Sequence, residues 1–142
     1  MSTMKGYEVI GHTADIGVKA YGATLKDLFV NAANGMFDIL LSANKQPMAG
    51  DKRLIVTYAV DKDQLLVKWL QELLFLYDAK RMVPVKFDIV KMTEKRLSAE
   101  VMTVPLDAVG FKMKHQIKAV TYHKVAIKKV DGQFTVTVIF DI

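Results

Sequence analysis

Two stretches of this sequence carry apolar residues at steps of three and four, the spacing of one face of a helix. The first stretch spans residues 24–41, and Thr24 is its predicted N-cap. The second spans residues 62–79 and follows Asp61, a predicted N-cap with Gln64 at the capping-box position. Because each helix has one apolar face, each needs a sheet to cover it.

The other apolar stretches are typical of strands, because they alternate or are rich in β-formers. Strands are predicted at residues 7–10, 16–21, 52–60, 85–90, 97–102, 117–130 and 133–140. Asp131-Gly132 suits a type I′ hairpin turn, in which both central residues need a positive φ. Strands joined mainly by hairpins exclude a doubly wound parallel sheet. We expect a single α+β domain over residues 1–142, with two layers and two helices on one face of a mostly antiparallel (mixed) sheet.

The composition excludes several classes of protein. Hydrophobic residues make up 51% and charged residues 25% of the 142 residues, which is typical of a folded globular chain. The absence of cysteine excludes disulfides and thiol chemistry. No apolar stretch approaches the ~20 residues that span a bilayer, and no signal-peptide core precedes the first strand. We therefore expect a soluble, cytoplasmic protein with no membrane partner.

The formal charge of +5 could draw the chain to nucleic acid through counterion release. Only Arg53, Arg81 and Arg96 are arginines, and most lysines are spread along the chain apart from a dense stretch between Lys112 and Lys129. A solvated strand face is the favoured interpretation of these lysines. Any RNA contact is expected to be indirect or weak.

Several common catalytic motifs are missing from the sequence. It has no GxGxxG, Walker, HExxH or GxSxG pattern, and its three histidines lack metal-ligand spacing. This favours a protein that is not an enzyme. A small RNA-binding or metal-dependent nuclease domain is an alternative, although the sequence offers no obvious catalytic base.

The end of the sequence brings carboxylates together. If Asp131-Gly132 is a two-residue loop, Tyr122 lies opposite Asp141, and Lys118 shares their face of the sheet. Asp141 and the terminal carboxylate of Ile142 are then close to both side chains.

A third carboxylate from a loop would complete a hard oxygen site, and Asp15, in the polar loop after the first strand, could supply it. Such a site prefers Ca²⁺ or Mg²⁺. Alternatively, Asp141 is simply solvated, Asp15 bonds its own backbone, or the carboxylates are protonated or form a salt bridge with Lys118.

Four blocks of the sequence are distinctive. They are His12-Thr13-Ala14-Asp15-Ile16-Gly17, Leu65-Leu66-Val67-Lys68-Trp69-Leu70-Gln71-Glu72-Leu73-Leu74, Ile117-Lys118-Ala119-Val120-Thr121-Tyr122-His123 and Val138-Ile139-Phe140-Asp141-Ile142. In this order, and over essentially the whole chain, the sequence resembles the archease family. The resemblance implies an archease-like fold.

The resemblance also implies a function in tRNA splicing and RNA repair. Archeases are non-catalytic proteins that assist the RtcB-type RNA ligase by promoting its guanylylation and its multiple turnover. An alternative implied by the family is a chaperone-like modulator of a tRNA methyltransferase.

The same resemblance implies a divalent cation, usually calcium, with Mg²⁺ or Mn²⁺ as alternatives. Its ligands would be Asp15, Asp141 and Ile142. By analogy Lys118 would take part in activating the partner, with His12 and Tyr122 at the rim of the site. The chain departs from the family pattern at Thr103-Val104, where many members have Gly-Glu, and at Gln116, where an acidic residue is common.

Overall fold

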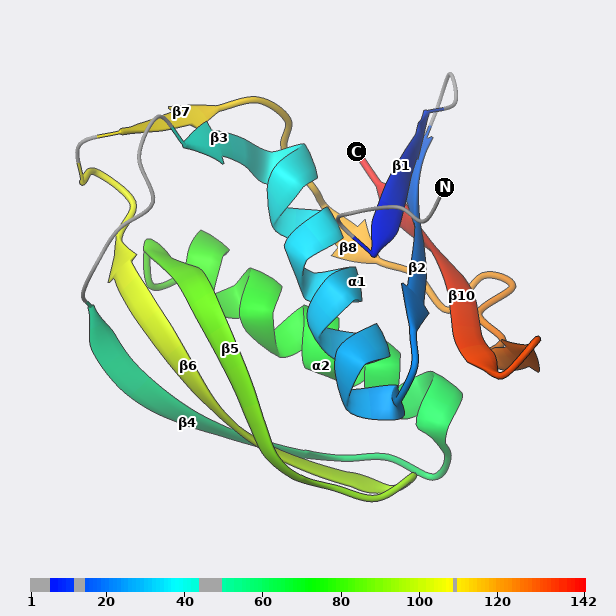
Figure 1. The fold of residues 1–142 in the computed structure, drawn as a ribbon. Helices are drawn as coiled ribbons and strands as arrows, with labels where there is room; N and C mark the ends of the chain where they lie inside the picture. The colour runs from blue at the N-terminus through cyan, green and yellow to red at the C-terminus, as the bar shows by residue number, and fades with distance from the viewer. Residues whose placement is uncertain (1–5, 12–14, 44–49, 109) are drawn as a thin grey trace.

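The computed structural model describes residues 6–11, 15–43, 50–108 and 110–142 (Figure 1). Its two helices within these ranges are α1 (Leu25–Leu40) and α2 (Lys62–Asp78). The strands are β1 (Tyr7–Gly11), β2 (Asp15–Gly22), β3 (Leu41–Ala43), β4 (Asp51–Tyr58), β5 (Met82–Met92), β6 (Arg96–Pro105), β7 (Phe111–Met113), β8 (Ala119–Val120), β9 (Lys128–Val130) and β10 (Gln133–Asp141).

The strands of the described residues form three antiparallel sheets. The first sheet has the order β1-β2-β10-β8, with β9 also paired to β10. The second joins β3 to β7, and the third has the order β4-β6-β5. The predicted α+β class, with two helices and antiparallel strands, is confirmed, but the strands are divided among separate sheets.

The two helices lie between the first and third sheets (Figure 1). Helix α1 contacts β1, β2 and β10 on one side and β5 on the other, while α2 contacts the third sheet and β8. Trp69 of α2 is fully buried, and its indole N–H donates to the carbonyl of Phe29 in α1 at 3.0 Å. The helices and the inner faces of both sheets therefore share one hydrophobic core.

Both predicted helix caps are confirmed. The Thr24 hydroxyl accepts a hydrogen bond from the backbone N–H of Asp27 at 3.1 Å. The Asp61 carboxylate accepts from the backbone N–H of Gln64 at 2.9 Å. Each cap satisfies one of the backbone donors that the first turn of a helix leaves unpaired, which fixes where the helix begins.

The last hairpin confirms the predicted turn but not the predicted register beyond it. Asp131 and Gly132 have φ values of 52° and 77°, and Gln133 pairs with Val130 as expected. Farther along β10, however, Asp141 pairs with Ala119, three residues away from the predicted partner, Tyr122. The prediction that Tyr122 lies opposite Asp141 was wrong.

The physical reason is that residues 121–127 form a loop between β8 and β9, in which only the first residue, Thr121, keeps a backbone hydrogen bond to β10 among the bonds that the described residues show. The Thr121 hydroxyl donates to the carbonyl of Ile139 at 2.9 Å and accepts from the backbone N–H of His123 at 3.3 Å. The backbone N–H of Val125 then donates to the carbonyl of Tyr122, closing a turn. This loop takes up the extra residues, so the strand predicted over 117–130 is split in two.

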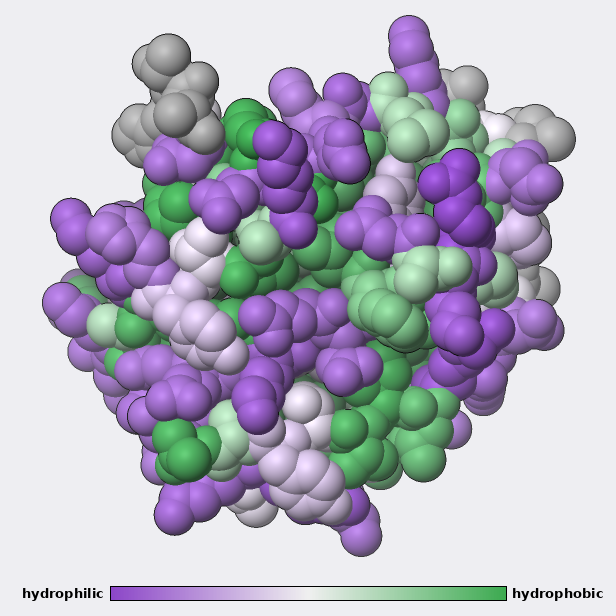
Figure 2. Space-filling model, turned by 180° about the vertical axis from the view of Figure 1, so that it is seen from behind, coloured by the Kyte–Doolittle hydropathy of each residue, from purple (hydrophilic) through white to green (hydrophobic). Residues whose placement is uncertain are grey.

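On the face seen from behind, hydrophilic side chains alternate with groups of hydrophobic side chains, which gather in its centre and lower part (Figure 2). Neither of the helices in the described residues is long and apolar enough to cross a membrane.

Candidate metal centre

Two carboxylates meet where β2 begins and β10 ends. Asp15 is the first residue of β2, Asp141 is the last of β10, and the two are Cα partners in the antiparallel ladder. Directly opposite residues of such a pair project on the same face, with Cβ atoms about 4.5–5.5 Å apart. The structure therefore brings together the two aspartates that the sequence predicted as ligands.

The core holds this pair in place from the other face of the sheet. Ile16 and Phe140, the next residues inward on each strand, are themselves Cα partners and are buried. Because strand side chains alternate, anchoring these two apolar residues directs the aspartates to the outer face.

Asp15 is only partly exposed, whereas Asp141 is exposed. The Oδ1 atom of Asp15 is fully buried and has no hydrogen-bond partner among the described residues. A buried acceptor without a partner costs about 1–3 kcal/mol, and like charges directly opposite in a sheet add repulsion. A hard divalent cation would relieve both effects, so an oxygen-ligand site for Ca²⁺ fits these residues.

Lys118 lies beside this pair through its backbone. Its N–H donates to the carbonyl of Asp141 at 2.7 Å, and the preceding residue, Ile117, is buried at 1% exposure. The Lys118 side chain is exposed. Among the described residues the one ion pair joins Lys114 to Asp38, so Lys118 forms no salt bridge with either aspartate. The alternative of a cluster salt-bridged to Lys118 is therefore not what the structure shows.

The other predicted residues have different positions. The prediction that Lys118 shares a face with Asp141 was wrong, because Asp141 pairs with Ala119 and not with Tyr122. Tyr122 is 50% exposed in the loop after β8 and has no pairing with β10. His12 lies outside the described residues. Ile142 packs part of its side chain against the core next to Asp141.

Within the described ranges, no three His, Cys, Asp or Glu side chains converge as a ready-made metal site. The candidate site contains two side-chain carboxylates, those of Asp15 and Asp141. The third ligand that the sequence predicted is the terminal carboxylate of Ile142, which is not a side chain.

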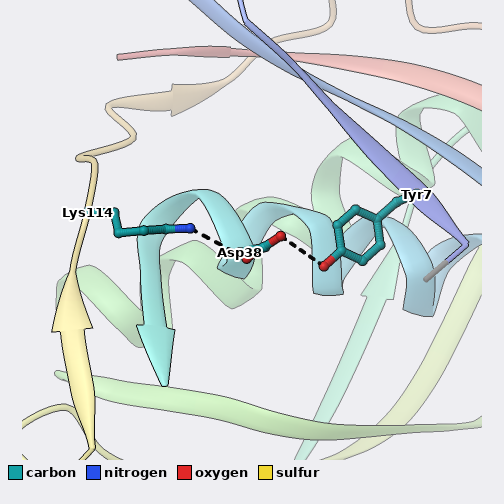
Figure 3. A network of polar contacts seen from close by, with 3 residues as sticks. All are labelled: Tyr7, Asp38 and Lys114. Carbon is teal, nitrogen blue, oxygen red and sulfur yellow. Dashed lines mark hydrogen bonds and ion pairs between the residues drawn. The ribbon is translucent and has the colours of Figure 1, made fainter. Parts of the chain in front are cut away.

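Sequence reasoning missed a polar network around Asp38 of α1 (Figure 3). The Tyr7 hydroxyl donates to Asp38 Oδ2 at 3.1 Å, and Lys114 Nζ lies 3.5 Å from Oδ1. Burial, followed by the charge of Asp38 and this hydrogen bond, raises the pKa of Tyr7 to about 12. The three residues are far apart in the sequence, so no spacing signal could have linked them.

Comparison with known proteins identifies the family of this chain. The model of the archease protein family matches residues 7–142. The chain belongs to the archease family. It is 36% identical to protein archease of Methanothermobacter thermautotrophicus over 98% of this chain and 100% of that protein. It is 32% identical to protein archease of Methanosarcina mazei over 97% of each.

Solved structures show the same fold. The solution structure of protein 1598 of Methanobacterium thermoautotrophicum has a TM-score of 0.78 at 32% identity, covering 98% of this chain and 100% of that one. The crystal structure of a Thermotoga maritima protein described as an archease and possible chaperone has a TM-score of 0.64 at 18% identity, covering 95% and 96%. The resemblance found in the sequence blocks, and the archease-like fold that it implied, are thus confirmed.

Proposed function

We propose that this archease is a non-catalytic, cytoplasmic activator of an RtcB-type RNA ligase in tRNA splicing and RNA repair. The observation that supports the proposal most is the Asp15–Asp141 pair, in which the buried Oδ1 atom of Asp15 has no hydrogen-bond partner among the described residues. The family resemblance associates this position with a divalent cation and with ligase activation.

The ligands of the cation would be Asp15, Asp141 and the terminal carboxylate of Ile142. An all-oxygen set of this kind suits Ca²⁺, with Mg²⁺ or Mn²⁺ as alternatives. When bound, the cation would supply positive charge that offsets the repulsion between the two aspartates and ties the start of β2 to the end of β10.

The chain's own residues would then present an ordered polar surface to the ligase. Lys118 has an exposed side chain, and its backbone N–H donates to the carbonyl of Asp141. In this position its ammonium could neutralise phosphate charge on the ligase-bound nucleotide. Docking of this surface would favour the guanylylation-competent state of the ligase, which increases turnover without any chemistry on archease itself.

Multiple-turnover RNA joining by an RtcB-type ligase from the same organism tests this proposal. Wild-type archease should convert a burst limited to one turnover into sustained turnover. Asp15→Asn should abolish the stimulation, whereas Asp131→Asn, which removes a carboxylate at the opposite end of β10, should not. Stimulation by Asp15→Asn at the wild-type level would exclude the aspartate pair from the mechanism.

A chaperone-like function on a tRNA methyltransferase is the second candidate. The description of the Thermotoga relative as a possible chaperone favours it. If wild-type archease changes neither guanylylation nor turnover of the ligase, but prevents aggregation of a methyltransferase that co-purifies with it, this second function takes first place.

A further inference from the structure

A group of lysines lies on the same outer face of the first sheet as the aspartate pair. Lys19 of β2 is the Cα partner of Thr137, and Lys128 of β9 is the partner of Thr135. Since Thr135 and Thr137 are two residues apart on β10, both pairs project on one face. The two lysines therefore flank the two threonines, one from each neighbouring strand.

The loop over residues 121–127 adds a third lysine. Lys124 has a left-handed φ of 55°, in the turn closed by the hydrogen bond from Val125 to Tyr122. A non-glycine residue in this conformation is strained by about 1–2 kcal/mol. The loop that shifts the register of β8 thus places Lys124 beside β9 and β10.

Together these residues line one hollow on the surface. Lys19, Lys124 and Lys128 surround a pocket of about 220 Å³, whose remaining walls are Ala126 and residues 135–137. The three lysines come from β2, from the loop over residues 121–127 and from β9. Their convergence therefore depends on the fold and not on one run of sequence.

The charge in this hollow is unbalanced. Among the described residues, no acidic side chain lines this hollow. The ion pair that these residues form, between Lys114 and Asp38, involves none of its three lysines. Glu8, opposite Lys19 on β1, accepts a hydrogen bond from the Tyr21 hydroxyl at 3.0 Å. By contrast, the larger pocket at the start of α1 has Asp27 and Asp88 beside Lys26. Lys19 Nζ also lies 5.7 Å from the centre of the Tyr21 ring, a contact that leaves its charge in place. Three cationic groups around one hollow favour an anion as its occupant.

We propose that Lys19, Lys124 and Lys128 bind a phosphate group, with the hydroxyls of Thr135 and Thr137 as hydrogen-bond donors. That this phosphate belongs to the backbone of a single-stranded RNA rests on the proposed function. Thr137 and Asp141 are four residues apart on β10, which corresponds to about 13 Å along a strand. An RNA strand held at the lysines could therefore extend along β10 to the aspartate pair and a ligase docked there.

Direct binding of fluorescein-labelled single-stranded RNA, measured by fluorescence anisotropy without any ligase, tests this site. The test variant carries Lys19→Gln, Lys124→Asn and Lys128→Gln, in which Asn tolerates the left-handed conformation. The matched control carries Lys52→Gln, Lys91→Gln and Lys95→Gln. It removes the same charge from exposed positions on the third sheet and its hairpin turn.

The test variant should bind RNA on the order of a hundredfold more weakly than wild type at about 0.1 M salt, and its salt slope should fall by about 0.7, the value for one phosphate of a single strand. The affinity of the control variant for RNA should fall much less. Equal losses in both variants would overturn the site, because they would show binding by overall charge. If the triple variant does not fold, Lys19→Gln against Lys52→Gln repeats the comparison.

Inorganic phosphate distinguishes the source of the anion. If RNA is the ligand, millimolar phosphate competes only weakly with it. Phosphate-induced shifts of the Thr135 and Thr137 amide signals, without any RNA binding, would overturn the assignment to RNA. Because no ligase is present, failure here is separate from failure of ligase activation, which the Asp15→Asn turnover experiment measures.

Discussion

Asp38 and Asp15 are two carboxylates of this molecule with opposite surroundings. Both oxygens of Asp38 have partners, one from the Tyr7 hydroxyl and one from the Lys114 ammonium. Asp15 has a buried oxygen with no partner among the described residues, and a second aspartate is its neighbour across the ladder.

Asp38 is a carboxylate satisfied within the fold, whereas Asp15 has a buried oxygen without a partner among the described residues. The network around Asp38 joins β1, α1 and the segment after β7, so it connects parts of the fold (Figure 3). The Asp15–Asp141 pair connects β2 to β10, but at a cost in repulsion that a cation would remove.

The largest effect should come from calcium. With free Ca²⁺ at about a hundred times its dissociation constant, the free energy of unfolding should rise by about 2.7 kcal/mol relative to the chelated protein. Urea denaturation in EDTA and in CaCl₂ measures this difference. Asp15→Asn should lose most of the gain, and Asp38→Asn should keep it. An equal gain in wild type and Asp15→Asn would place calcium elsewhere.

Removing the Tyr7 hydroxyl should cost about 1 kcal/mol of stability, because the substitution leaves Asp38 without one donor. The pKa of Tyr7 is raised from 10.0 to about 12, so the contribution is fully present below pH 10 and is lost as the pH rises towards 12. The advantage of wild type over Tyr7→Phe should therefore begin to shrink as the pH rises above 10 and be gone before pH 12. Tyr21→Phe, which removes a hydroxyl bonded to the exposed Glu8, is the matched control. A constant difference across this pH range would contradict the assignment.

Replacing aspartate by asparagine should change the free energy of unfolding in opposite directions at Asp15 and at Asp38. In EDTA, Asp15→Asn should raise the free energy of unfolding by about 0.5 kcal/mol, because it removes the repulsion with Asp141. Asp38→Asn should lower it, because the charge that accepts from Tyr7 and attracts Lys114 is lost. Chemical denaturation of both variants in chelator measures the two signs. Destabilisation by both would mean that Asp15 is already satisfied by the protein.

The smallest effect should come from Lys114→Gln. Lys114 and Asp38 are 3.5 Å apart, and their side chains are 38% and 36% exposed. Half-exposed pairs of this kind contribute about 0–1 kcal/mol and are screened by salt. We expect a loss below about 0.5 kcal/mol that vanishes in high salt. A larger loss that is insensitive to salt would show that the pair is desolvated.

Sequence reasoning succeeded where the determining interactions are local. The caps at Thr24 and Asp61 act within three residues, and the positive φ values at Asp131 and Gly132 follow from the residue types of one turn. The proximity of Asp15 and Asp141 was anticipated from the family resemblance, but their pairing across the ladder of β2 and β10 was not.

The prediction of one continuous strand over residues 117–130 failed because its interruption depends on tertiary contacts. Nothing in the composition of residues 117–130 marks where the strand is interrupted, because β-branched residues occur on both sides of the loop. The interruption is stabilised from outside, since the backbone N–H of Ile127 donates to the carboxylate of Asp63 in α2 at 2.9 Å. The short strands β3 and β7 were missed because three residues are too few for a periodic signal.

A calcium titration of ¹⁵N-labelled protein, followed by its amide signals, shows whether Asp15 and Asp141 bind the cation. If the two aspartates bind calcium, we expect saturable shifts at Asp15, at Asp141 and at Lys118, whose N–H is bonded to the Asp141 carbonyl. Tyr7 and Asp38 should not shift. Shifts confined to other residues, or none at millimolar calcium, would contradict the claim that the facing aspartates form a cation site.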